Sequence, residues 1–159
     1  MDIELITERN KRVCFAGHRE VYQREINEKV KNIIADLARQ GSIEFLTGGM
    51  GKFDRICSGA VRSTKKDFPN MKLWLVLPYM LKSINTQRDY FCELYDEIIL
   101  PDGSENAHRK AAITMRNRWI VEQSGIMLAY VGRSFGGAYQ TIRYAQKHGG
   151  VEIINLYKK

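Results

Sequence analysis

The chain has 159 residues and a mass of 18.4 kDa, a length that fits a single domain, which we expect to span residues 1–159. Apolar residues make up 44%, enough for a packed core and too many for a disordered chain. The net charge of +7 and the isoelectric point of about 9.4 favour an anionic partner, but they do not choose between a nucleotide, a phosphate and nucleic acid.

Membrane, secreted and metal-binding classes receive no support from the sequence. No apolar run approaches the ~20 residues that span a bilayer, and the polar start, residues 1–11, lacks the apolar segment of a secretion signal. We therefore expect a cytoplasmic protein with no membrane partner, in which residues 1–11 form a polar lead-in. The 3 cysteines and 3 histidines show no metal-ligand spacing, which predicts neither a disulfide framework nor a metal site.

Short apolar runs alternate with helix-like stretches along the chain. In order, we expect strands at residues 12–16, 43–47, 73–77, 97–100, 126–131 and 151–156, separated by helices at residues 25–40, 53–66, 84–94, 107–123 and 138–147. A helix between successive strands predicts parallel pairing, and nearly continuous apolar strands predict burial on both faces of the sheet. The predicted fold is therefore α/β, a Rossmann-like, doubly wound, mainly parallel sheet with helices on both faces, in a three-layer sandwich.

In such a sheet, ligands bind beyond the carboxyl ends of the strands, so the loops that follow the strands are the candidate site. The first predicted strand is followed by Gly17, His18 and Arg19. The glycine lets the backbone approach a ligand, His18 can donate a hydrogen bond or act as acid or base, and Arg19 offers a fork of donors to a phosphate. The alternative is a turn with two solvated polar side chains.

A cluster of glycines follows the second predicted strand, at Gly48, Gly49 and Gly51, with Met50 between them. Such a loop permits positive φ angles and bare amides, so it predicts a phosphate-binding nest at the N-terminus of the next helix. Asp54 follows the loop. It either caps this helix or hydrogen-bonds a ribose hydroxyl or another ligand group.

A second glycine loop follows the fifth predicted strand and contains Gly136 and Gly137, with Thr141 one turn into the next helix. Two loops of this kind favour a phosphate-bearing ligand. The helix before that strand carries Arg116 and Arg118, which are two residues apart and do not share a helix face. Either one arginine reaches the ligand while the other bonds within the protein, or both belong to a solvated face.

Four segments, in this order, resemble the YpsA/YoqJ-type proteins of the SLOG superfamily: CFAGHR, FLTGGMGKFD, MRNRWIVEQSG and GGAYQTIRYA. The resemblance spans residues 12–156. The superfamily consists of Rossmann-like nucleotide-ligand domains and also includes the Lonely Guy phosphoribohydrolases and the DNA-processing protein DprA. The resemblance implies a nucleotide or phosphoribosyl ligand and no other cofactor. It implies a site built from Gly17, His18, Arg19, Gly48, Gly49, Gly51, Asp54, Arg116, Arg118, Gly136, Gly137 and Thr141.

One departure from the relatives bears on catalysis. Lonely Guy enzymes carry a PGGxGTxxE pattern whose glutamate serves hydrolysis of an N-glycosidic bond. Here Phe135 replaces the proline, and residues 142–145, after Thr141, include no carboxylate. Asp54 or Glu122 could substitute in principle, and no residue is assigned as catalytic.

Three functions stay open. The first is a nucleotide-binding module, a sensor or carrier without catalysis, and the second is an enzyme that cleaves the N-glycosidic bond of nucleoside monophosphates. The third is binding of single-stranded DNA in the manner of DprA. We rank it lowest, because no basic stripe accompanies the aromatic residues Tyr22, Tyr79, Tyr90 and Phe91. Association of copies through helix faces is also left open.

Overall fold

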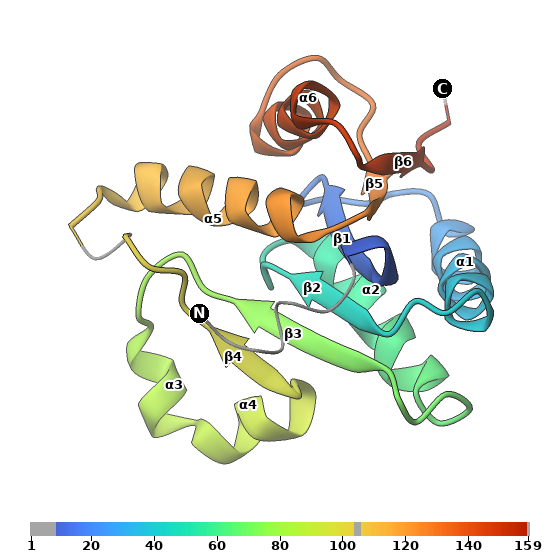
Figure 1. Ribbon diagram of the computed structural model, residues 1–159, viewed down its shortest axis with the longest axis horizontal. Helices are drawn as coiled ribbons and strands as arrows, with labels where there is room; N and C mark the ends of the chain where they lie inside the picture. Colours follow the sequence, from blue (N-terminus) through green and yellow to red (C-terminus); the bar gives the residue numbers. More distant parts are fainter. Residues whose placement is uncertain (1–8, 104–105, 159) are drawn as a thin grey trace.

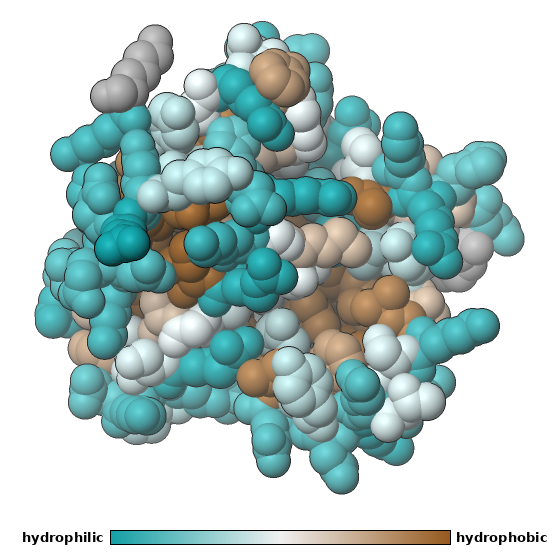
Figure 2. All heavy atoms as spheres, turned by 180° about the vertical axis from the view of Figure 1, so that it is seen from behind, coloured by the Kyte–Doolittle hydropathy of each residue, from teal (hydrophilic) through white to brown (hydrophobic). Residues whose placement is uncertain are grey.

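A computed structural model describes residues 9–103 and 106–158, so most of the polar lead-in lies outside the described residues (Figure 1). No helix among the described residues is long and apolar enough to cross a membrane. Hydrophilic side chains cover most of the face shown in Figure 2, and apolar side chains are visible between them. A short 3-10 turn at Arg9–Lys11 precedes the first strand. The elements that follow are β1 (Arg12–Gly17), α1 (Ile26–Arg39), β2 (Glu44–Thr47), α2 (Lys52–Thr64), β3 (Lys72–Val76), α3 (Lys82–Thr86), α4 (Arg88–Leu94), β4 (Glu97–Ile99), α5 (Arg109–Gln123), β5 (Ile126–Tyr130), α6 (Gly137–His148) and β6 (Glu152–Asn155).

The described strands form one six-stranded sheet in the order β4-β3-β2-β1-β5-β6. Every neighbouring pair is parallel, so the Rossmann-like α/β prediction is confirmed, with a sheet that is entirely rather than mainly parallel. The chain runs outward from β1 to β4 and then continues on the other side of β1 with β5. The switch point of the topology therefore lies between β1 and β5, where ligands bind in folds of this class.

The side chains of each strand alternate between two cores, as the period of two requires. Val13 and Phe15 of β1 belong to the core that α1 and α2 cover. Cys14 and Ala16 belong to the core that α5 and α6 cover. The two helix pairs lie on opposite faces of the sheet (Figure 1), which confirms the three-layer arrangement.

The single helix predicted at residues 84–94 is wrong. Two short helices, α3 and α4, replace it, and the chain leaves the helical region at Gln87, with φ −123° and ψ 40°. Neither helix has a buried residue, so no packed apolar face stabilises one continuous helix here. The edge strands β4 and β6 also lack fully buried residues, so the predicted burial on both faces holds only for the inner strands.

Candidate functional site

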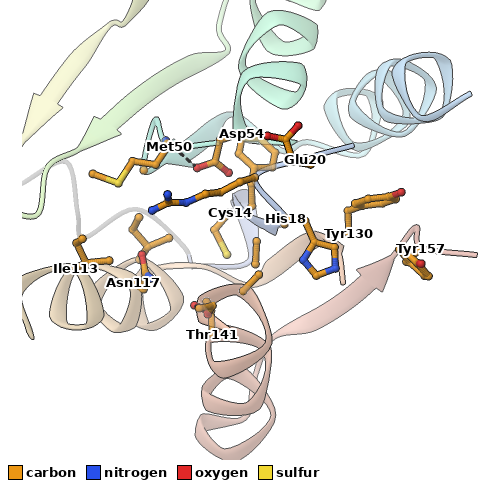
Figure 3. Close-up of a pocket in the computed structure, with 18 of the residues that line it drawn as sticks. Cys14, His18, Glu20, Met50, Asp54, Ile113, Asn117, Tyr130, Thr141 and Tyr157 are labelled. Carbon is orange, nitrogen blue, oxygen red and sulfur yellow. Dashed lines mark hydrogen bonds between the residues drawn. The ribbon is translucent and has the colours of Figure 1, made fainter. Parts of the chain in front are cut away.

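A cavity of about 600 Å³ lies at the switch point, beyond the carboxyl ends of β1 and β5 (Figure 3). Its volume is within the range of small-molecule sites. Nine of the predicted site residues line it: Gly17, His18, Arg19, Gly48, Met50, Asp54, Arg116, Gly137 and Thr141. Gly49, Gly51 and Gly136 belong to the same glycine loops without lining the cavity, and Arg118 lies elsewhere. The fold therefore brings together loops that are more than 100 residues apart in the chain.

The two arginines of α5 have different surroundings. Arg116 is only 4% exposed, and its Nη1 donates to the carbonyl oxygens of Gly48 at 3.1 Å and Val76 at 2.9 Å. A Cβ atom at position 48 would lie 2.9 Å from the Arg116 Cζ, so a glycine is needed for this close approach. Arg118 instead stacks its guanidinium over the Tyr144 ring, at 5.0 Å from the centroid. Arg116 thus both reaches the cavity and bonds within the protein, whereas Arg118 does not line the cavity.

Three amides of the first glycine loop and its following residue donate hydrogen bonds within the protein. Gly49 and Gly51 have φ angles of +70° and +89°, as a glycine-dependent turn requires. The amides of the loop donate to protein acceptors: Gly49 N to Thr47 Oγ1 at 3.1 Å, Met50 N to Asp54 Oδ2 at 3.4 Å, and Lys52 N to the Arg19 carbonyl at 2.9 Å. These three amides are therefore bonded within the protein, and the phosphate nest at this loop stays a prediction.

The second glycine loop leads into the N-terminus of α6, where Gly137 and Ala138 line the cavity. Gly136 is the N-cap of α6, with a φ angle of 92° and no side-chain cap. The amides of Gly137, Ala138 and Tyr139 have no acceptor among the residues that the structure describes. The first turn of α6 has no acidic residue, and a Cβ at Gly136 would lie 3.3 Å from the Arg133 Nη2. This end of the cavity is therefore rich in donors and positive.

The opposite side of the cavity carries two carboxyl groups, beside Arg19 and Arg116 of the lining. Figure 3 shows Asp54 and Glu20 together on the α2 side, with Thr141 of α6 across from them. Burial raises the pKa of Asp54 to about 7, although the Arg116 guanidinium and the Met50 N–H both act to lower it. Asp54 is therefore partly ionised near neutral pH. Such a carboxyl can accept hydrogen bonds from a ligand or exchange a proton with it.

The pH dependence of stability tests this carboxyl. Between the ordinary pKa of 3.8 and about 7, Asp54 binds more protons in the folded state than in the unfolded state, so the free energy of unfolding falls as pH rises. Asp54→Asn keeps an acceptor for the Met50 N–H but has no titrating carboxyl. It should therefore not lose stability in this way as pH rises. We expect its Tm to exceed that of the wild type at about pH 8 and the difference to shrink toward about pH 4. A Tm difference that stays constant between about pH 4 and about pH 8 would contradict the raised pKa of Asp54.

His18 has a defined hydrogen-bonding role. Its Nε2 accepts from the Gly132 N–H at 2.9 Å, so the proton of the neutral ring is on Nδ1. Burial, and secondarily Arg133, lowers the pKa of His18, which favours this neutral ring. The ring lies edge-on to Tyr130 and Tyr157, at centroid distances of 5.8 and 6.2 Å. His18 thereby links the loop after β1 to the loop after β5.

Several cavity residues were not predicted to belong to the site: Glu20, Asn117, Tyr130, Arg133 and Tyr157. Three of them, Glu20, Asn117 and Arg133, lie within or beside the predicted motifs. Their closeness to these motifs in the sequence is the signal that could have identified them. Tyr157 carries no such signal, because it follows β6 near the end of the chain and reaches the cavity only through the pairing of β6 with β5. At the cavity lining, burial raises the pKa of the Cys14 thiol to about 12, so this cysteine is not a reactive thiolate. The described residues include no group of three or more His, Cys, Asp or Glu side chains that could hold a metal ion.

No known family profile and no curated protein matches the sequence. Several solved structures share its fold, including the following two. One is DNA processing protein A from Helicobacter pylori, which has a single-stranded DNA binding mode. It matches with a TM-score of 0.68 and 18% sequence identity, over 99% of this chain and 70% of that chain. The other is the structural-genomics target TM1055, with a TM-score of 0.60 and 14% identity, over 88% of this chain and 71% of that one. At these identities the likeness establishes a shared Rossmann-like fold.

Proposed function

We propose that this chain is a binding module for a nucleotide or phosphoribosyl ligand, held in the cavity between β1 and β5. The observation that carries the proposal is the bare N-terminus of α6 at the cavity, with Arg133 beside it and Arg19 also in the lining. Helix N-termini bind phosphate through their amides and dipole, and an arginine adds charge-assisted hydrogen bonds. We therefore propose that the phosphate group of the ligand lies at the N-terminus of α6.

The carboxyl groups on the other side of the cavity support the same orientation. A carboxylate repels a phosphate but accepts hydrogen bonds from sugar hydroxyls. Asp54 and Glu20 therefore suit the ribose end of the ligand (Figure 3). The cavity has one end suited to an anion and another suited to a hydroxyl-rich group, as a phosphoribosyl compound requires.

Thermal unfolding in the presence of ligands tests the proposal. Ligands that bind only the folded state raise its stability by RT ln(1 + [L]/Kd), so AMP, ADP-ribose or ribose 5-phosphate should raise the Tm. Arg133→Ala should reduce the shift, because it removes charge next to the α6 N-terminus. The matched control Arg118→Ala, outside the cavity, should retain it. Absence of a shift with all three compounds would contradict the proposal.

Cleavage of an N-glycosidic bond is the second candidate, and the position of Asp54 favours it. Of the two carboxylates considered as substitutes for the missing glutamate, Asp54 lines the cavity with a pKa of about 7, whereas Glu122 bonds the Tyr144 hydroxyl outside it. In this reaction the bond from C1′ to the base nitrogen breaks, water adds to C1′, and the base leaves with a proton. Incubation with AMP should then release adenine and ribose 5-phosphate, and Asp54→Asn should abolish the release.

Binding of single-stranded DNA is the third candidate. It is favoured by the fold shared with DNA processing protein A and by a groove between α1 and α2 whose lining includes Lys31, Lys52 and Arg55. Phosphate contacts of this kind make affinity fall steeply with salt. A salt-independent affinity for an oligonucleotide would count against this candidate.

A further inference from the structure

One residue of the cavity lining, Tyr22, is an exposed aromatic. Tyr22 is 85% exposed, the highest value among the large apolar side chains that the structure describes, and it is also part of the cavity lining. Single exposed apolar residues are common on protein surfaces. A ring beside a ligand cavity is different, because it offers a flat apolar face next to bound polar groups.

The backbone on both sides of Tyr22 is held in place. Val21 is buried in the core at 5% exposure, and the Gln23 side chain donates from Nε2 to the Lys158 carbonyl at 3.0 Å. The start of the same loop is fixed where the Lys52 N–H donates to the Arg19 carbonyl at 2.9 Å. The ring is thus presented from an anchored loop, which lowers the ordering cost of a contact with ligand.

Residues 155–158 are hydrogen-bonded to this loop through Gln23 and Lys158, and they supply a second ring, Tyr157, to the cavity. Tyr157 packs on Gly132 so closely that a Cβ there would lie 2.2 Å from its ring atoms, and its centroid is 5.1 Å from that of Tyr130. Asn155 fixes the segment, since its side chain accepts from Val131 N at 3.1 Å and donates to Val131 O at 2.9 Å. The hydrogen bond from Gln23 to Lys158 joins the two ring-bearing segments into one rim.

We infer that this rim is a base-stacking platform, in which Tyr22 provides the exposed ring and Tyr157 a wall of the cavity, so that the ligand is a base-bearing nucleotide rather than a sugar phosphate alone. The inference rests on the proposed function. A sugar phosphate satisfies the α6 N-terminus and the Asp54 side but leaves the aromatic rim unused. Every nucleobase has a π-face that can stack on an aromatic ring, whichever base it is.

Titration calorimetry with two probes, AMP and ribose 5-phosphate, tests the platform. For the wild type, AMP should bind more tightly than ribose 5-phosphate. Tyr22→Ala should weaken AMP binding about tenfold, within the range that stacking contributes, and leave ribose 5-phosphate binding unchanged. Tyr22→Phe keeps the ring and should retain wild-type affinity for AMP. Tyr90→Ala, which removes another exposed tyrosine away from the cavity, should change neither affinity.

The outcomes separate this inference from the proposed function. Equal binding of both probes, with AMP affinity unchanged in Tyr22→Ala, would overturn the platform and leave the phosphoribosyl site standing. Binding of neither probe by the wild type would overturn both. Equal weakening of both probes in Tyr22→Ala would also overturn the platform, because it would show a general effect on the loop rather than a contact with the base.

Discussion

Replacing Arg116 by alanine should lower the free energy of unfolding by about 2–5 kcal/mol, because each buried polar group left unpaired costs about 1–3 kcal/mol. The substitution removes the donors to the Gly48 and Val76 carbonyls, which lie at the ends of β2 and β3. It also removes the positive charge that lowers the pKa of Asp54. Chemical denaturation followed by circular dichroism measures the loss.

Arg118→Ala is the matched control for this prediction, since it lies on the same helix and removes the same side chain from an exposed position. Its contact is a stacking over Tyr144, so we expect a loss of no more than about 1 kcal/mol. Equal losses for the two variants would show that the contacts of Arg116 with the strand ends do not stabilise the fold.

Gly17→Ala should destabilise the protein by about 1–3 kcal/mol or more through overpacking of the core. The new Cβ would lie 2.3 to 2.6 Å from the Cδ2, Cγ and Cβ atoms of Phe53, which is fully buried and stacked on Tyr130. Because the Phe53 ring is fully buried and stacked on Tyr130, it has little room to move away from the new methyl group. Differential scanning calorimetry measures the change.

Gly59→Ala provides the opposite expectation with the same chemical change. Gly59 lies inside α2, and a Cβ there meets no atom within 4 Å. Alanine lowers the entropy of the unfolded chain, so we expect a gain of about 0.4–1 kcal/mol. A Gly17→Ala variant as stable as the wild type would contradict the close packing of Phe53 against β1.

The fold was predictable because its signals are local and repeated. Apolar runs such as those at β1 and β3 alternate with amphipathic stretches such as α1, and this alternation alone leads to a parallel sheet. The break at Gln87 was not predictable in this way. The spacing of apolar residues there resembles a helix, but the fold fully buries none of the residues of this segment.

The candidate site was predictable as a set of loops, though not as a set of contacts. Glycines at 49 and 51 indicate positive φ angles, but they do not reveal that neighbouring amides donate to Thr47 and Asp54. Helical spacing separates Arg116 from Arg118 without saying which one is buried. Tyr157 becomes part of the cavity only because β6 pairs with β5, a long-range arrangement that no local pattern encodes.

We propose that the N-terminus of α6 holds the phosphate of a nucleotide. Amide chemical shifts during a titration of the protein with AMP test this position, because each backbone N–H reports on its own acceptor. The largest changes should occur at Gly137, Ala138 and Tyr139, whose amides have no acceptor among the described residues. Largest changes at residues 49–52 instead, or no saturable change at α6, would contradict the claim.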